Sequence, residues 1–203
     1  MSIADLRRDY ARARLDEANV SSDPVAQFER WFAEAREAKV MEPNAMALAT
    51  ATREGAPSVR MVLLKGADQR GFVFFTDYRS QKGVELELNP RAALVFYWPE
   101  LERQVRITGR VSSVATEESD AYFRSRPLSS RLSAWASHQS EVIPDRVQLE
   151  ERARQAAQRF PVGAVGPEQP DPRPRTKWWR SSRHDVRHGV WWMSVAPLAR
   201  YAS

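Results

Sequence analysis

The chain has 203 residues, 42% of them hydrophobic and 28% charged, which is the balance of a folded globular protein. It contains no cysteine, which excludes disulfides, thiolate nucleophiles and cysteine-ligated metal centres and fits a cytoplasmic location. The net charge of +5 lies mostly in residues 161–203, which hold seven Lys and Arg against three Asp and Glu. The body of the chain therefore offers no basic face for nucleic acid, and we expect no membrane span or signal peptide.

We divide the chain into an N-terminal arm over residues 1–20, a folded domain over 21–160 and a C-terminal segment over 161–203. Residues 3–16 have helical spacing and predict a short exposed helix or arm. Asp23 and Pro24 have the character of an N-cap and a first helical residue, so a helix is expected to begin there. An amphipathic stripe follows at spacings of three to four residues, formed by Val25, Phe28, Trp31, Phe32 and Ala35.

Five strands are expected after this helix. Residues 45–52 and 58–65 alternate as a hairpin around the turn at 54–57, and the aromatic run at 71–76 predicts a third strand. A helix over 80–88 separates these from a second hairpin, 92–98 and 103–114. Three helices follow, at 116–126, 129–137 and 145–160.

This order predicts an α+β fold, an antiparallel sheet or small barrel with helices at its ends. Neither the glycine-rich fingerprint of a dinucleotide-binding unit nor that of a P-loop is present.

Two cations interrupt the second expected strand. In a regular strand Arg60 and Lys65 face opposite sides of a largely apolar segment, which is costly unless each cation has an anionic partner or reaches water. One interpretation is that both are strand-end residues that reach solvent. The other is that the strand serves two separate anions, one on each side.

Three further groups are candidates for ligand binding. Ser80, Gln81 and Lys82 open a helix directly after a strand, which suits a phosphate but is also an ordinary capped helix start. Gln104 could hydrogen-bond a planar heterocycle, although a solvated sheet exterior explains it as well. His138, near a helix end, is interpreted as a surface residue rather than a base.

A fourth candidate group spans the end of one expected helix and the start of the next. Tyr122 and Arg126 lie at positions i and i+4, and Ser130 follows just after a proline. Together these side chains could clamp a phosphate monoester. The alternative is a surface pair followed by the cap of the next helix.

Eight short motifs in order give the chain a recognisable pattern: FERW (28–31), RMVLLK (60–65), FT (75–76), SQK (80–82), NPR (89–91), LERQ (101–104), YFRSRP (122–127) and QS (139–140). The chain resembles the pyridoxine/pyridoxamine 5′-phosphate oxidase family from about residue 6 to residue 160. The resemblance implies a split β-barrel homodimer with flavin mononucleotide (FMN) at the subunit interface. It also implies no metal site.

The resemblance also implies roles for individual residues. The cofactor would be held by Arg60, Met61, Val62, Leu63, Leu64, Lys65, Phe75, Thr76, Gln81, Lys82, Gln104, Gln139 and Ser140, some of them from the partner subunit. The substrate phosphate would be held by Lys65, Tyr122, Arg126 and Ser130, and covered by an arm that includes Arg7 and Tyr10. The opposed cations Arg60 and Lys65 would then serve two different phosphates.

The implied reaction is the oxidation of pyridoxamine or pyridoxine 5′-phosphate to pyridoxal 5′-phosphate, in which O2 is reduced to H2O2. Two features depart from the family pattern. Gln81 stands where the oxidases usually have Arg, and the C-terminal segment lacks the family's Arg-Leu-His sequence. The most similar stretch is Arg183 followed directly by His184. In a strand these two side chains would point to opposite faces, so we treat them only as candidate catalytic residues.

These departures leave two alternatives to the oxidase. One is a flavin oxidase of the same fold with another substrate, such as a phenazine precursor. The other is a protein that binds FMN or pyridoxal phosphate without turnover.

Overall fold

The computed structural model describes residues 2–6, 17–137, 139–140, 142–159, 178–181 and 194–197. Its helices are α1 (Pro24–Glu37), α2 (Gln81–Leu88), α3 (Thr116–Ser125), α4 (Leu128–Ala136) and α5 (Arg146–Arg159). Its strands are β1 (Ala45–Ala51), β2 (Pro57–Asp68), β3 (Gly71–Phe75), β4 (Arg91–Trp98), β5 (Arg103–Ser113), β6 (Trp178–Ser181) and β7 (Ser194–Pro197). Single-turn 3-10 helices lie at Ile3–Asp5, Glu17–Asn19 and Pro99–Leu101.

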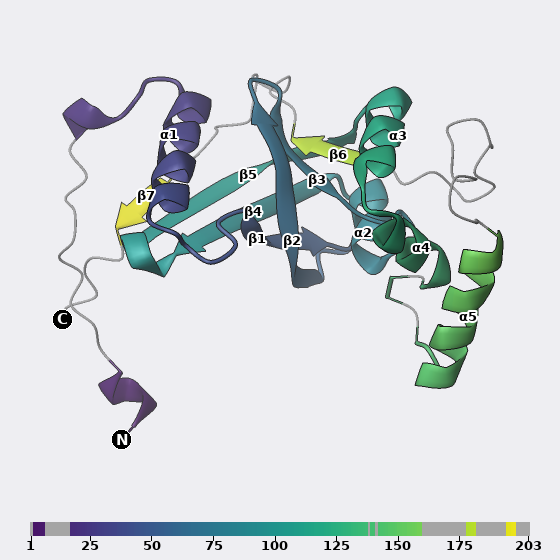
Figure 1. Cartoon of the computed structure of the whole chain (residues 1–203). Coiled ribbons are helices and arrows are strands. Elements are labelled where there is room, and N and C mark those ends of the chain that lie inside the picture. Colours follow the sequence, from purple (N-terminus) through teal and green to yellow (C-terminus); the bar gives the residue numbers. More distant parts are fainter. Residues whose placement is uncertain are drawn as a thin grey trace.

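The strands form one curled antiparallel sheet, the α+β split barrel that the sequence predicts. They follow the order β4-β1-β2-β3-β6-β5-β7, and an additional β4–β5 pairing brings the sheet back on itself. Helix α1 lies at one end of this sheet and α2 to α5 gather at the other, as Figure 1 shows. The hairpins expected from the sequence are the β1–β2 and β4–β5 pairs.

The inner face of the sheet carries the core. Cross-strand neighbours share a face, and the pairs Met46↔Val62 and Phe96↔Val105 belong to an inward layer in which Met46, Phe96 and Val105 are fully buried. Helix α1 closes this layer with Phe28 and Trp31, which are almost completely buried. Asp23 caps the helix by accepting a hydrogen bond from the Val25 N–H at 2.9 Å, and Pro24 is its first residue, as predicted.

The outer face of the same sheet is apolar, and no helix or strand of the described residues packs on it. Val59 and Met61 on β2 are 69% and 65% exposed, and Tyr97 on β4 is 50% exposed. The register places Met61 opposite Ala47, and Ala47 opposite Val95, so the apolar rows continue across β2, β1 and β4. Monomeric proteins seldom leave so continuous an apolar surface in water.

Strand β2 is longer than its sequence pattern indicates and changes partners along its length. Its first part pairs with β1 up to Leu63, and its last part pairs with β3 from Leu64 onwards. The register shifts between Leu64 and Gly66, which marks a bulge at this change of partner. The strand therefore leaves one edge of residues 58–63 without a partner strand in the described part of the chain.

The C-terminal segment is described at two short strands. Strand β6 pairs with both β3 and β5, and β7 pairs with the first part of β5. The remainder of the N-terminal arm and of the C-terminal segment, including Arg7, Tyr10, Arg183 and His184, lies outside the described residues, and so does His138. Within the described residues, no helix is long and apolar enough to span a bilayer.

Candidate functional site

A cleft of about 1070 Å³ lies where the free edge of β2 meets the helical end of the sheet. The end of β3, the loop before α2 and the start of that helix form its second wall, and α3, α4 and residues 139–140 form the rest. The described residues from 58 to 63 and Lys65 all line it. Consecutive residues of a strand point to opposite faces of the sheet, so they reach the same cleft only because the cleft runs along the strand's edge.

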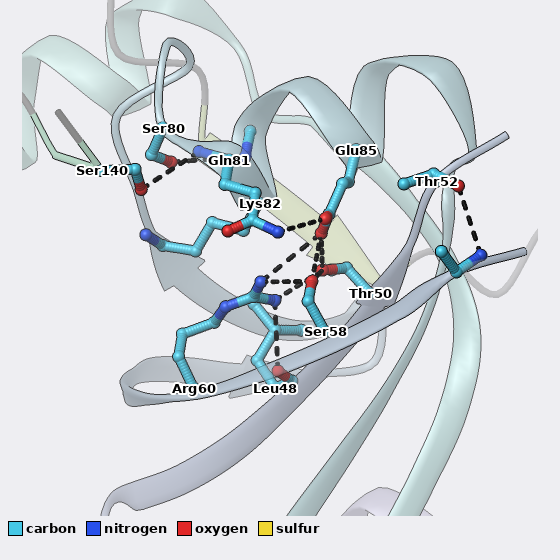
Figure 2. A network of polar contacts seen from close by, with 12 residues as sticks. Leu48, Thr50, Thr52, Ser58, Arg60, Ser80, Gln81, Lys82, Glu85 and Ser140 are labelled. Carbon is cyan, nitrogen blue, oxygen red and sulfur yellow. Dashed lines mark hydrogen bonds and ion pairs between the residues drawn. The ribbon is translucent and has the colours of Figure 1, made fainter.

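Arg60 enters the cleft from β2 as part of a compact polar network (Figure 2). Its guanidinium donates to the Thr50 and Ser58 hydroxyls at 2.5 and 2.6 Å, and its Nη2 lies 3.4 Å from the Glu85 carboxylate. These partners belong to β1, β2 and α2, so the network ties the helix to the sheet. The Arg60 side chain remains 21% exposed.

Glu85 is the centre of that network. It is 4% exposed and accepts hydrogen bonds from Thr50, from Ser58 at 2.6 Å and from the Gln81 amide at 2.9 Å. Burial alone would raise the pKa of Glu85, but the three hydrogen bonds and the charge of Arg60 outweigh it and lower the pKa below its usual value. Glu85 is therefore a buried carboxylate that stays ionised at neutral pH.

The start of α2 supplies a second cation. Ser80 caps the helix as predicted, accepting from the Gly83 N–H at 3.3 Å. Lys82 Nζ donates to Gln139 Oε1 at 2.8 Å, and the Gln81 N–H donates to Ser140 Oγ at 3.2 Å. Burial, and then the charge of Arg60, lower the pKa of Lys82, which indicates that the two cations are close enough to repel each other.

Gly83 allows the helix start to lie close to the preceding loop. A Cβ added at Gly83 would lie 2.5 Å from the Asp77 carbonyl oxygen and 2.7 Å from the Tyr78 carbonyl carbon. Both contacts are shorter than side chains tolerate, so this approach requires glycine.

The second group of polar side chains that line the cleft comes from the region of α3 and α4. The ring of Tyr122 packs on that of Phe75 at the end of β3, and burial raises the pKa of Tyr122 against the opposing effect of Arg126. The Arg126 guanidinium lies 5.9 Å from the centre of the Phe123 ring. Ser130, at the start of α4, lines the same cleft. Tyr122, Arg126 and Ser130 therefore all line the cleft, and their role in binding stays a prediction.

The structure brings most of the predicted site residues together. The cleft is lined by Arg60, Met61, Val62, Leu63, Lys65, Phe75, Thr76, Gln81, Lys82, Tyr122, Arg126, Ser130, Gln139 and Ser140. Arg60 and Lys65 both reach it, because the cleft follows the strand edge and takes side chains from both faces. Two predicted residues do not line it: Leu64 is buried in the core, and Gln104 lies on β5 opposite Tyr97.

Sequence reasoning missed several residues of the cleft. Asp77 and Arg79, in the loop before α2, line it, as do Ser129, Ser133 and Ser137 from the α4 region. The serines follow one another at steps of four residues, which is a helical-face signal that the sequence does contain. Glu85 does not line the cleft and has no comparable signal. The described residues hold no cluster of His, Asp and Glu suited to a metal ion.

The sequence comparisons point to one family. The family model described as pyridoxamine 5′-phosphate oxidase matches residues 32–160. The pyridoxine/pyridoxamine 5′-phosphate oxidase of Burkholderia ambifaria is 60% identical over 159 residues, which cover 78% of this chain and 74% of the relative. The protein of the same name from Cupriavidus pinatubonensis is 58% identical over 158 residues, with the same coverage.

Two solved structures resemble the chain. PhzG from Burkholderia lata, in complex with tetrahydrophenazine-1-carboxylic acid, is 34% identical, with a TM-score of 0.72 over 81% of this chain and 78% of that one. A pyridoxamine 5′-phosphate oxidase-related, FMN-binding protein from Nostoc punctiforme has a TM-score of 0.58 at 19% identity, over 80% of this chain and 82% of that one. At that identity the second similarity concerns the fold alone.

Proposed function

The chain belongs to the pyridoxamine 5′-phosphate oxidase family, and we propose that it is an FMN-dependent oxidase that converts pyridoxamine or pyridoxine 5′-phosphate to pyridoxal 5′-phosphate. One observation carries the proposal. A single cleft is lined by two groups of side chains whose chemistry suits an anion: Arg60 with Lys82, and Tyr122 with Arg126 and Ser130. A cofactor phosphate and a substrate phosphate need two such groups.

The cleft fits FMN in size and chemistry. Its volume of about 1070 Å³ lies at the upper end of small-molecule sites, as a cofactor and substrate together require. Arg60 and Lys82 suit the cofactor phosphate, and the free edge of β2 offers backbone N–H and C=O groups to a planar ring system. Phe75 and Thr76 would contact the cofactor from the end of β3, and Gln81, Gln139 and Ser140 from the helix start.

FMN, when bound, would supply the acceptor for a hydride from the substrate C4′ position and return the two electrons to O2, which becomes H2O2. The alcohol of pyridoxine 5′-phosphate also gives up a proton and becomes the aldehyde directly. The amine of pyridoxamine 5′-phosphate becomes an imine, which water hydrolyses to the aldehyde with release of ammonia. The protein's part is to bind and to orient. Lys65, Tyr122, Arg126 and Ser130 would fix the substrate phosphate, and that fixes the position of its reacting carbon. No side chain is needed as a general base if that carbon is held in place.

We propose that the functional unit is a homodimer. The uncovered apolar face continues from β4 to β2, and Val59, Met61 and Leu63 belong both to that face and to the cleft. A second copy on this face would border the cleft and complete it. Gln104 lies opposite Tyr97 on the same outer face, which places it to contribute to the partner's cleft.

A second candidate function has its own observation. PhzG, 34% identical to this chain, was solved with a tetrahydrophenazine carboxylic acid, so a carboxylated tricyclic substrate is the alternative. The group formed by Tyr122, Arg126 and Ser130 favours the phosphate ester, since it offers a charged guanidinium and two hydroxyls to one anion.

The substrate assignment is tested with Arg126→Ala. We expect KM for pyridoxamine 5′-phosphate to rise about 10- to 100-fold, because a charge-assisted bond to phosphate is lost, whereas bound FMN per chain stays unchanged. Arg124→Ala, on an exposed position of the same helix outside the cleft, is the matched control and should leave KM unchanged. If Arg126→Ala lowers the bound FMN per chain as much as it lowers the affinity for substrate, Arg126 does not belong to the residues that bind the substrate phosphate.

A further inference from the structure

The chain contains two copies of one local turn, Asp-x-Arg. In Asp68-Gln69-Arg70 the Arg70 N–H donates to the Asp68 carboxylate at 2.7 Å, and its guanidinium binds the same carboxylate at 2.9 and 3.2 Å. In Asp77-Tyr78-Arg79 the backbone bond is also made, at 2.9 Å. The guanidinium contacts, however, are 3.4 and 3.5 Å. The contact between the guanidinium and the aspartate of its own turn is therefore shorter for Arg70 than for Arg79.

The two turns also differ in location. Arg70 is an exposed residue of the β2–β3 turn, outside the cleft, whereas Asp77 and Arg79 both line the cleft. Asp77 is the only carboxylate among the described lining residues. It lies in the loop directly before α2, whose first turn carries Lys82, and its charge acts to raise the pKa of Lys82. Arg79 immediately precedes Ser80, the cap of α2.

We propose that Arg79 is a further ligand for the cofactor phosphate, held by Asp77 until the phosphate binds. The inference rests on the proposed function, since it names a third cation for the same end of the FMN site. It assigns opposite effects to two neighbouring residues: Arg79 strengthens FMN binding and Asp77 weakens it.

The geometry allows the guanidinium to leave Asp77 without opening the loop. The turn is kept by contacts that do not involve the guanidinium. The Asp77 carboxylate accepts from the Arg79 N–H, and the Asp77 carbonyl accepts from the Ser80 hydroxyl at 2.5 Å and the Ser80 N–H at 3.1 Å. The Arg79 side chain is 35% exposed, and its guanidinium meets the Asp77 carboxylate only at the far limit of hydrogen-bond distance. A phosphate offers it shorter, bidentate bonds.

The Asp77 carboxylate also gives a reason for a third cation at the proposed phosphate site. An unscreened Asp77 beside Lys82 would repel an arriving phosphate. Paired with Arg79, the carboxylate is neutralised before the anion binds, and the arginine changes partners when the anion arrives.

The experiment compares FMN with riboflavin, which has the same ring system but no phosphate, by titrating flavin fluorescence with apoprotein. In Arg79→Gln we expect the Kd for FMN to rise about tenfold while the Kd for riboflavin is unchanged, because only a charge-assisted phosphate bond is lost. In Asp77→Asn, whose amide oxygen can still accept from the Arg79 N–H, FMN should bind several-fold more tightly. That gain should shrink in the double variant, because the released arginine is then missing.

Arg70→Gln and Asp68→Asn are the matched controls, because they make the same changes in the same turn outside the cleft. Both should leave the Kd for FMN and the Kd for riboflavin unchanged. If Arg79→Gln alters the ratio of these constants no more than Arg70→Gln does, or if the gain in Asp77→Asn is the same with and without Arg79, the inference is wrong. If the inference about Arg79 fails but the wild-type protein binds FMN more tightly than riboflavin, the proposed cofactor is still supported. If the wild-type protein binds neither flavin, both the inference and the proposed cofactor are wrong.

Discussion

At the scale of single residues, the contact between Arg60 and Glu85 joins β2 to α2 beside the cleft. Glu85 is buried, and its three hydrogen-bond donors and Arg60 compensate for the loss of water. Removing the carboxylate takes away the acceptor of the Thr50 and Ser58 hydroxyls, the Arg60 guanidinium and the Gln81 amide. The network therefore contributes both to stability and to the position of Arg60 in the cleft.

A pH dependence follows from the lowered pKa of Glu85. Because the folded state holds the proton less tightly than the unfolded state, the contribution of Glu85 is complete above the unfolded pKa, near 4.5, and is lost as pH falls through the lower folded pKa. We expect Glu85→Gln to lower the free energy of unfolding by about 1–3 kcal/mol at pH 7, with a smaller difference from wild type at pH 3.5. Urea unfolding of the apoprotein at both pH values measures this, and an equal difference at both would contradict it.

Lys82 carries a prediction about the cofactor. Replacing Lys82 with Ala removes a cation that the proposed site directs at the FMN phosphate, so the Kd for FMN should rise about 10- to 100-fold. Riboflavin affinity and the thermal midpoint of the apoprotein should change little. Undiminished FMN affinity in this variant would remove Lys82 from the phosphate site.

The sequence predicted most residues of the cleft but not the network of polar contacts around Glu85. Arg60, Lys82, Tyr122 and Arg126 were identifiable because cations and hydroxyls recur at strand and helix spacings, and the family resemblance implied roles for them. Glu85 could not be identified, because a carboxylate in a helix is normally exposed and its burial depends on donors from two other elements. The opposite faces expected for Arg60 and Lys65 did not reveal that both reach one cleft along the strand edge.

At the scale of elements, the start of α2 depends on how closely it approaches the loop before it. Gly83→Ala gains helix propensity of about 1 kcal/mol, but its Cβ would meet the backbone of Asp77 and Tyr78. We expect the second effect to dominate, with a net loss of about 1–3 kcal/mol in the free energy of unfolding. Chemical denaturation tests this.

Gly66→Ala is the control for this substitution. A Cβ there would lie 3.7 Å from the nearest atom of Val73, an ordinary contact, so it should cost less. A stability of Gly83→Ala equal to that of wild type would show that the loop gives way to the added methyl group.

The secondary structure was predictable because its signals are local. Caps, turns and alternation fixed the hairpins and helices to within a few residues. The extension of β2 to Asp68 and its change of partner were not predictable, since a bulge and a second partner strand depend on tertiary pairing. The pairing of β6 with both β3 and β5 likewise joins segments far apart in the chain.

At the scale of the whole molecule, the uncovered apolar face predicts association. We expect the chain to elute at twice its mass of 23.2 kDa in size-exclusion chromatography with light scattering. Tyr97→Asp places a charge in that face outside the cleft and should yield monomers. Val147→Asp, which replaces an exposed apolar residue on α5, is the control and should leave the mass unchanged. A monomeric wild-type chain would contradict the proposed dimer.

The proposed oxidation is tested most directly by turnover. Purified chain with excess FMN is given pyridoxamine 5′-phosphate, and pyridoxal 5′-phosphate and H2O2 are followed together, with a tetrahydrophenazine carboxylic acid as the parallel substrate. We expect both products from the phosphate ester, in equal amounts, at a rate well above that with the phenazine compound. Bound flavin with no pyridoxal 5′-phosphate formed would contradict the proposed function.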